Sequence, residues 1–155
     1  MEKKYKLTDE TINVCGKKLC RIEALKDFRD VNKGDKGGFI EDEYNLSHYG
    51  NSWVYDNARV YGNAMVYGDA WVYGEAWVCG DAKIENNSDY IVFKNWWSSG
   101  RYFTWTRSND MWKVGCFYGN GEELIKKAYK DSELSGRQYE RIVKYVEEIN
   151  KENGK

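Results

Sequence analysis

Proline is absent from this 155-residue sequence, histidine occurs once, and there is no run of 18 apolar residues. Without proline, the turns must depend on the 15 glycines and on the asparagine and aspartate residues beside them. The lack of a long apolar run argues against a membrane-spanning helix. The charged residues 1–6 are followed by no apolar stretch, so they do not have the pattern of an export signal. We therefore expect a cytoplasmic protein that does not bind a membrane.

Cysteine is also sparse, and its spacing does not suit a metal site. Cys15 and Cys20 are close together, whereas Cys79 and Cys116 are distant from both. A structural zinc site needs four ligands at short paired spacings, so we expect no metal, and no other cofactor is indicated. Thiols stay reduced in the cytoplasm, and the one disulfide worth considering joins Cys15 to Cys20 across a hairpin.

The composition is that of a folded chain. Hydrophobic residues make up 41% of the sequence and charged residues 32%, which is enough apolar material for a core and does not indicate disorder. The length favours one domain, or a repeat unit with small flanking caps.

A six-residue repeat dominates the middle of the chain. From Val54 the sequence is VYDNAR, VYGNAM, VYGDAW, VYGEAW, VCGDAK and IENNSD. The same frame extends backwards in degenerate form, with Ile40, Leu46 and Ser52 at the alanine position. This gives nine hexamers over residues 36–89.

The repeat predicts which side chains point inward. Successive side chains of a strand alternate between its two faces, so the valine and alanine of each hexamer should be buried and the aromatic residues should point out. Glycine suits the positive φ of each corner, and asparagine or aspartate beside it can cap the turn. Three strands would close a coil of eighteen residues, which stacks Trp53 on Trp71 and Tyr55 on Tyr73.

The pattern V-x-G-[DN]-A-x resembles the hexapeptide-repeat superfamily, which implies a left-handed β-helix. Residues 22–28, 34–41 and 45–47 are also similar to the leader of VYGNA-repeat proteins found in bacteria and their phages. That likeness places the chain near mobile elements.

The expected fold class is therefore mainly β, a short left-handed hexapeptide-repeat β-helix between two caps. Residues 1–35 should form an N-terminal β-hairpin cap, residues 36–89 the β-solenoid, and residues 90–155 a C-terminal β-β-β-α-α cap. In that last part we expect strands at 90–93, 102–106 and 111–117. The two helices should be capped by Asn120 with Glu123, and by Ser135 with Gln138.

Catalysis is not favoured by the residues. Hexapeptide-repeat proteins are often acyltransferases, in which a histidine between subunits of a trimer acts as general base. Here His48 occupies the inward valine position of an early hexamer, where a capping role is the simpler interpretation. Residues 119–121, with the sequence GNG, could bind a phosphate but are typical of a loop and helix cap. A base-stacking strand around Tyr102 is the weaker alternative to a buried sheet face. We expect no catalytic residue.

The outward residues of the repeat are candidates for binding. They are aromatic where a free surface could have been polar, and two carboxylates stand at nearby corners. The expected binding residues are Trp53, Tyr55, Tyr61, Tyr67, Trp71, Tyr73 and Trp77, with Asp69 and Glu75. The alternative is that these rings pair with each other, or that the C-terminal segment covers one face.

Charge indicates the kind of partner. Residues 36–89 contain nine acidic and three basic residues, a net charge of −6, so direct nucleic-acid binding there is disfavoured. The sequence therefore predicts a non-catalytic protein-binding module whose partner has a basic surface. The phage likeness implies an inhibitor of a host defence or nucleic-acid-handling protein, comparable to an anti-CRISPR protein. The alternatives are an acyltransferase-like enzyme, a self-assembling structural homo-oligomer, or a protein that binds a small nucleotide.

Overall fold

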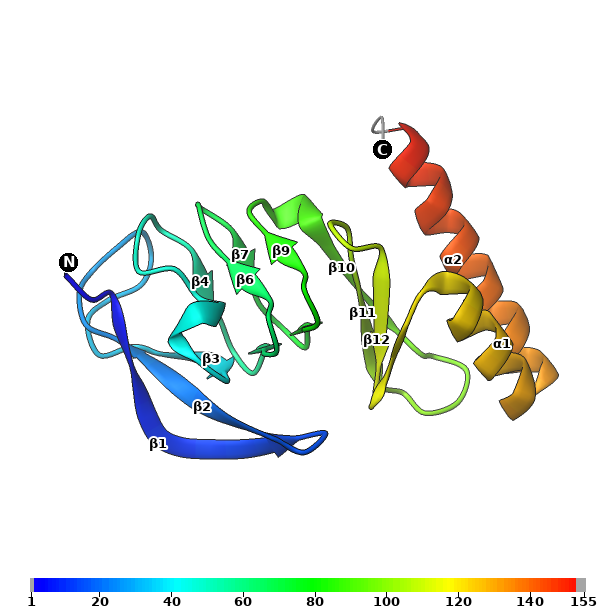
Figure 1. Cartoon of the computed structure of the whole chain (residues 1–155), viewed down its shortest axis with the longest axis horizontal. Helices are drawn as coiled ribbons and strands as arrows, with labels where there is room; N and C mark the ends of the chain where they lie inside the picture. Colours follow the sequence, from blue (N-terminus) through cyan, green and yellow to red (C-terminus); the bar gives the residue numbers. More distant parts are fainter. Residues whose placement is uncertain (1, 153–155) are drawn as a thin grey trace.

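The structure is a computed structural model that describes residues 2–152, and it contains four small β-sheets followed by two helices (Figure 1). A long hairpin, β1 (Tyr5–Val14) and β2 (Lys17–Ala24), precedes β3 (Lys36–Ile40) and the short 3-10 turn η1 (Glu43–Asn45). Six two-residue strands follow: β4 (Trp53–Val54), β5 (Arg59–Val60), β6 (Met65–Val66), β7 (Trp71–Val72), β8 (Trp77–Val78) and β9 (Lys83–Ile84). The last part comprises η2 (Asn87–Asp89), β10 (Tyr90–Lys94), β11 (Tyr102–Thr106), β12 (Met111–Val114), β13 (Phe117–Gly119), α1 (Gly121–Asp131) and α2 (Glu133–Glu152).

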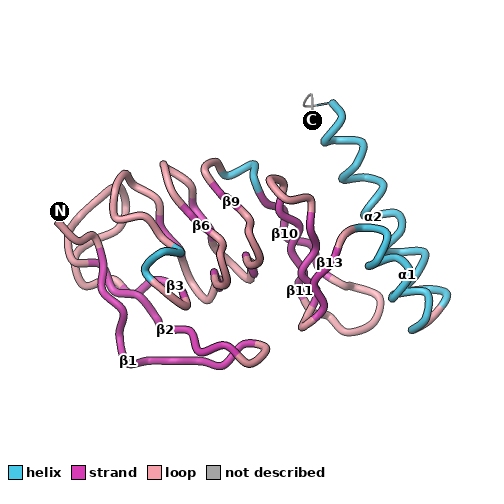
Figure 2. The backbone as a smooth tube through the Cα atoms, viewed as in Figure 1, coloured by secondary structure: helices cyan, strands magenta, loops and turns pink. Residues whose placement is uncertain are grey.

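The expected fold class, a mainly β left-handed hexapeptide-repeat β-helix, is wrong. The strands form separate small sheets: a mixed one of order β1-β2-β3-β5-β8, an antiparallel one of order β10-β11-β12-β13, and the pairs β4-β7 and β6-β9. Each strand between β3 and β10 has only two residues, because a turn follows every pair, and Figure 2 shows that most of this region is loop. Two helices complete the chain, so its class is mixed α and β.

Within this arrangement, residues 53–84, here called the hexamer segment, do pair at a spacing of eighteen. Trp53 lies beside Trp71, Arg59 beside Trp77, and Met65 beside Lys83, all in parallel. The predicted inward direction of valine and alanine is confirmed. The fully buried valine and alanine side chains of the segment are Val54, Ala58, Val60, Ala64, Val66, Ala70, Val72, Ala76, Val78 and Ala82. Each buried valine contributes about 1.5–3 kcal/mol relative to an exposed one.

The predicted frame holds at Ser52, which is fully buried at the alanine position, but it is wrong before residue 50. Ile40 pairs with Val60 and Leu46 with Val66, a spacing of twenty, so both take the valine position and not the alanine position. Their side chains are too large for the narrow alanine position. Gly38 lies there instead, and a Cβ on it would be 2.5 Å from the carbonyl oxygen of Ala58.

The N-terminal hairpin was predicted correctly, and it packs against one side of the hexamer segment. β2 pairs with β3, and the hairpin runs along the side of the hexamer segment toward the C-terminal sheet (Figure 1). Val14 and Leu19, near its tip, pack with Phe39, Tyr61 and Cys79 in a small buried cluster. The hairpin therefore covers one side of the stacked hexamers.

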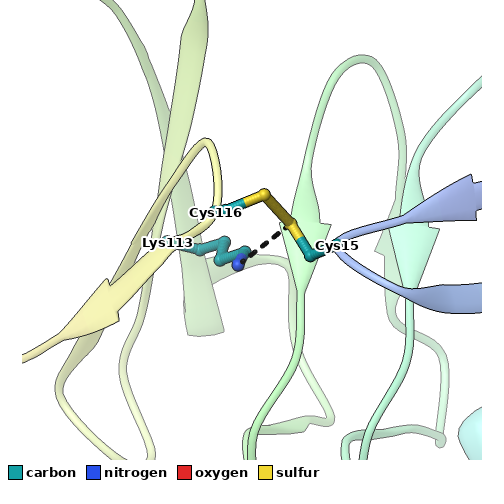
Figure 3. Close-up of a disulfide and its surroundings, with 3 residues drawn as sticks. All are labelled: Cys15, Lys113 and Cys116. Carbon is teal, nitrogen blue, oxygen red and sulfur yellow. Dashed lines mark hydrogen bonds between the residues drawn. A yellow bond between two sulfur atoms is a disulfide. The ribbon is translucent and has the colours of Figure 1, made fainter.

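A disulfide joins the tip of the hairpin to the C-terminal sheet (Figure 3). Cys15 is bonded to Cys116, 101 residues later, in the turn between β12 and β13. The expectation of reduced thiols, with Cys15–Cys20 as the one possible disulfide, is wrong. Cys20 lies opposite Thr11 in the hairpin, which keeps it away from the turn, and the free thiols are Cys20 and Cys79.

The C-terminal part contains one strand more than predicted. The segment expected as a single strand, 111–117, turns at Gly115, where φ is +55°, and gives β12 and β13. Asn120 and Glu123 form the predicted capping box of α1. The predicted cap at Ser135 is wrong, because α2 begins at Glu133 and the hydroxyl of Ser132 accepts the N–H of Ser135. The two helices pack on the sheet around a second core that includes Phe103, Trp105, Trp112, Leu124, Tyr139, Val143 and Val146.

Candidate functional site

Two of the expected binding residues are buried. Trp53 is only 1% exposed, because the rings of Phe28 and Tyr5 contact it edge-on at 5.2 Å and 6.3 Å between centroids. Tyr61 is 5% exposed and lies in the cluster under the hairpin, with the Lys113 ammonium 5.9 Å from its ring. Burial raises the pKa of Tyr61 well above its usual range. Neither ring can contact a partner, because the N-terminal residues cover both.

Tyr67 and Asp69 lie apart from the other expected residues, whereas Trp77 lines a hollow together with Glu75. Trp77 is half-buried, and the guanidinium of Arg59 lies 4.7 Å from the centre of its ring. The backbone N–H of Trp77 donates to the hydroxyl of Thr104. Tyr67 is half-buried and its N–H donates to the carbonyl of Ile84, on another side of the stack. Asp69 is exposed but lines none of the hollows described below.

The remaining four, Tyr55, Trp71, Tyr73 and Glu75, are brought together. The first three line one hollow of about 240 Å³, together with Asp30 and Asp56. The ring of Tyr55 stands nearly perpendicular to both neighbours, at 72° to Trp71 and 86° to Tyr73, with centroids 6.1 Å and 6.2 Å away. This hollow, here called the cage, combines three aromatic walls with two carboxylates.

A tight turn between β2 and β3, at residues 28–31 and here called the leader turn, forms one edge of the cage. Phe28 and Val31 exchange two backbone hydrogen bonds, of 2.9 Å and 2.8 Å, which leaves Arg29 and Asp30 at the tip. Asp30 accepts a hydrogen bond of 2.8 Å from the hydroxyl of Tyr55. Burial, followed by this hydrogen bond, raises the pKa of Tyr55 above its usual range. Tyr55 therefore stays a neutral donor that holds the carboxylate in place.

Trp71 is fixed from several directions. The guanidinium of Arg29 lies 3.8 Å from the centre of the Trp71 ring. The backbone N–H of Trp71 donates to the side-chain oxygen of Asn87, and its backbone carbonyl accepts from the hydroxyl of Tyr90. Burial raises the pKa of Tyr90 to about 12, so this hydroxyl also stays protonated. Among the described residues, the indole N–H of Trp71 is buried with no hydrogen-bond partner. Such a donor costs free energy unless something binds it.

The cage continues into two further hollows toward the C-terminal sheet. Tyr73 also lines the next one, of about 520 Å³, with Glu75, Tyr90 and Tyr102 among its other walls. Glu75 and Tyr102 in turn line a third hollow of about 250 Å³, where Arg101 is also a wall. We call this connected surface the aromatic groove, defined by Tyr55, Trp71, Tyr73, Tyr90 and Tyr102.

Sequence reasoning missed the contributions of Asp30, Asp56, Tyr90 and Tyr102 to the groove. Tyr102 was weighed only as part of a base-stacking strand, and Asp56 was counted only as a charge. The turn at residues 28–31 brings Asp30, and β10 and β11 bring Tyr90 and Tyr102, beside the hexamer segment that contains Asp56, and no local pattern encodes that proximity. Tyr73 and Tyr102 are the most open aromatic walls, at 51% and 47% exposure.

His48 contacts the N-terminal residues of the chain. Its Nδ1 accepts the backbone N–H of Lys4 at 3.1 Å, and its Nε2 is 2.7 Å from a carboxylate oxygen of Glu43. The hydrogen bond from His48 lowers the pKa of Glu43. The ring of Tyr5 stacks on the imidazole at 4.1 Å. Both ring nitrogens are engaged within the protein.

No protein-family model matches the chain, and no curated protein matches its sequence. In the part of the chain that the structure describes, neither helix has the length and apolar character to cross a membrane.

Proposed function

We propose that this chain is a non-catalytic binding protein that presents the aromatic groove to a basic surface of a protein partner. The observation that carries the proposal is the pairing of open aromatic rings with unpaired carboxylates. Within residues 2–152, neither Asp30, Asp56 nor Glu75 has an ion-pair partner within 4 Å. Exposed aromatic residues are enriched at protein interfaces, and complementary charge speeds association.

A partner that handles nucleic acid would offer the required basic surface. The net charge of −6 over residues 36–89 disfavours contact with phosphates but suits a channel lined by lysine and arginine. The likeness to phage-associated repeat proteins supports a host defence or nucleic-acid-handling protein as the target. The chain would then act by occupying that channel.

The test is affinity capture from bacterial extract, identification of the retained protein, and repetition with purified partner and variants. Tyr73→Ser with Tyr102→Ser removes the two most open rings of the groove. Tyr44→Ser with Tyr49→Ser removes two exposed tyrosines elsewhere, at 54% and 70% exposure, and is the matched control. We expect the first pair to weaken binding at least tenfold and the second to leave it unchanged.

Binding should also weaken as salt rises, because the attraction between a carboxylate surface and a basic partner is screened. Equal binding by both variants would contradict the proposal. If the wild type and the control variant form a discrete oligomer and the Tyr73→Ser, Tyr102→Ser variant does not, the groove instead joins copies of this chain.

A further inference from the structure

We propose that the cage binds the guanidinium group of an arginine side chain supplied by the partner. This inference names the chemistry recognised at one end of the aromatic groove, and it rests on the proposed function. Aromatic faces attract cations through their negative π-systems, and several rings around one cation are the usual form of such a site. Tyr55, Trp71 and Tyr73 provide three rings at steep angles around one hollow.

The two carboxylates of the cage are available to a cation. Asp30 uses Oδ1 to accept from Tyr55, and Asp56 uses Oδ2 to accept from the N–H of Gly74 at 3.1 Å. Elsewhere in residues 2–152 no hydrogen bond reaches the second oxygen of either carboxylate, and no ion pair neutralises them. The cage therefore places two free carboxylate oxygens beside three aromatic walls.

Hydrogen bonds hold both carboxylates in place. Asp56 has φ of +53°, a left-handed conformation that aspartate and asparagine tolerate, and its hydrogen bond to Gly74 links two successive turns of the stack. Asp30 stands at the tip of the leader turn, held by Tyr55. A site with preset charges and rings loses little freedom on binding.

Arginine is favoured over lysine because, within this protein, guanidinium groups approach aromatic rings more closely than ammonium groups do. Three guanidinium groups lie within 5 Å of an aromatic centroid, those of Arg21 on Phe39, Arg29 on Trp71 and Arg59 on Trp77. Every lysine ammonium near a ring in the described residues is farther away, at 5.2 Å or more. A planar guanidinium can stack on a ring while its edge donates to carboxylates, which a compact ammonium cannot do.

The size of the cage also suits one side chain. Its volume of about 240 Å³ is below the range of roughly 300–1,000 Å³ that is usual for pockets of drug-sized ligands, and it opens into the rest of the groove, where the partner backbone would lie. Arg29 is not among its walls, so its place on Trp71 leaves the cage open.

The experiment titrates isotope-labelled protein with N-acetyl-arginine N-methylamide and follows the amide and indole signals by NMR. The neutral probe is the citrulline analogue, which keeps the shape and replaces the guanidinium by a urea. We expect saturable shifts at Trp71 and Tyr73 with the arginine probe, and at least fivefold weaker binding of the citrulline and lysine analogues.

Charge variants of identical shape decide the role of the carboxylates. Asp30→Asn and Asp56→Asn keep an acceptor for Tyr55 and Gly74 but remove the charge. Each should weaken the arginine probe about threefold, and both together about tenfold, since the site is partly open to solvent. Asp9→Asn, an equal charge change on an exposed residue of the hairpin, should have no effect.

Equal binding of the citrulline or lysine probe would overturn the guanidinium assignment, and so would binding that both cage variants leave unchanged. The two proposals fail separately. If partner capture depends on Tyr73 and Tyr102 but the arginine probe does not bind, only the proposed role of the cage is rejected. If the arginine probe binds but no captured partner depends on the groove, only the proposed function is rejected.

Discussion

Loss of the Cys15–Cys116 disulfide should destabilise the protein by several kcal/mol. The bond closes a loop between residues 101 apart, so it restricts the unfolded chain strongly. In the chain-entropy description, closing a loop of about 100 residues is worth about 4.7 kcal/mol at 25 °C. A variant with Cys15→Ser and Cys116→Ser should lose most of this free energy of unfolding. That is a large share of the 5–15 kcal/mol typical of a domain.

The assay is equilibrium unfolding in urea, monitored by tryptophan fluorescence, of the wild type and the double variant without reductant. Cys20→Ser, which removes a half-buried free thiol, is the control and should change stability by far less. Thiol titration of the denatured, unreduced wild type should find two free thiols, Cys20 and Cys79. Four titratable thiols, or a double variant within about 1 kcal/mol of the wild type, would refute the reasoning.

The remaining predictions concern burial. Trp53→Ala should cost about 3–5 kcal/mol of unfolding free energy, because Phe28 and the hexamer core enclose that ring. Trp71→Ala should cost less than half of this. Equal losses of stability in urea unfolding would contradict the difference in burial. Burial lowers the pKa of Lys4 from 10.5 to about 8, although its ammonium donates to the carbonyl of Ser52 at 2.6 Å. Between pH 8 and 10.5 the unfolded state therefore binds the proton on Lys4 and the folded state does not. The stability of the wild type relative to Lys4→Met should rise with pH over this range, by on the order of 2 kcal/mol. A difference in stability between the two proteins that does not change with pH would count against the pKa shift.

The sequence by itself determined the local features of this protein. The hexamer period fixes which residues are buried, because strand alternation turns each valine and alanine inward, and it fixes the spacing of eighteen between paired residues such as Trp53 and Trp71. The hairpin, the cap at Asn120 and the strand Tyr102–Thr106 were equally predictable, since each depends on residues close in the chain.

Only the tertiary structure decided the rest. The spacing of twenty at Ile40 depends on which side chain fits against the next layer, and the bond from Cys15 to Cys116 depends on where the hairpin tip ends. Trp53 and Trp71 occupy the same position of the repeat, yet a leader turn covers one and leaves the other half-open. The repeat specifies a direction for each side chain, whereas exposure depends on what distant segments pack against it.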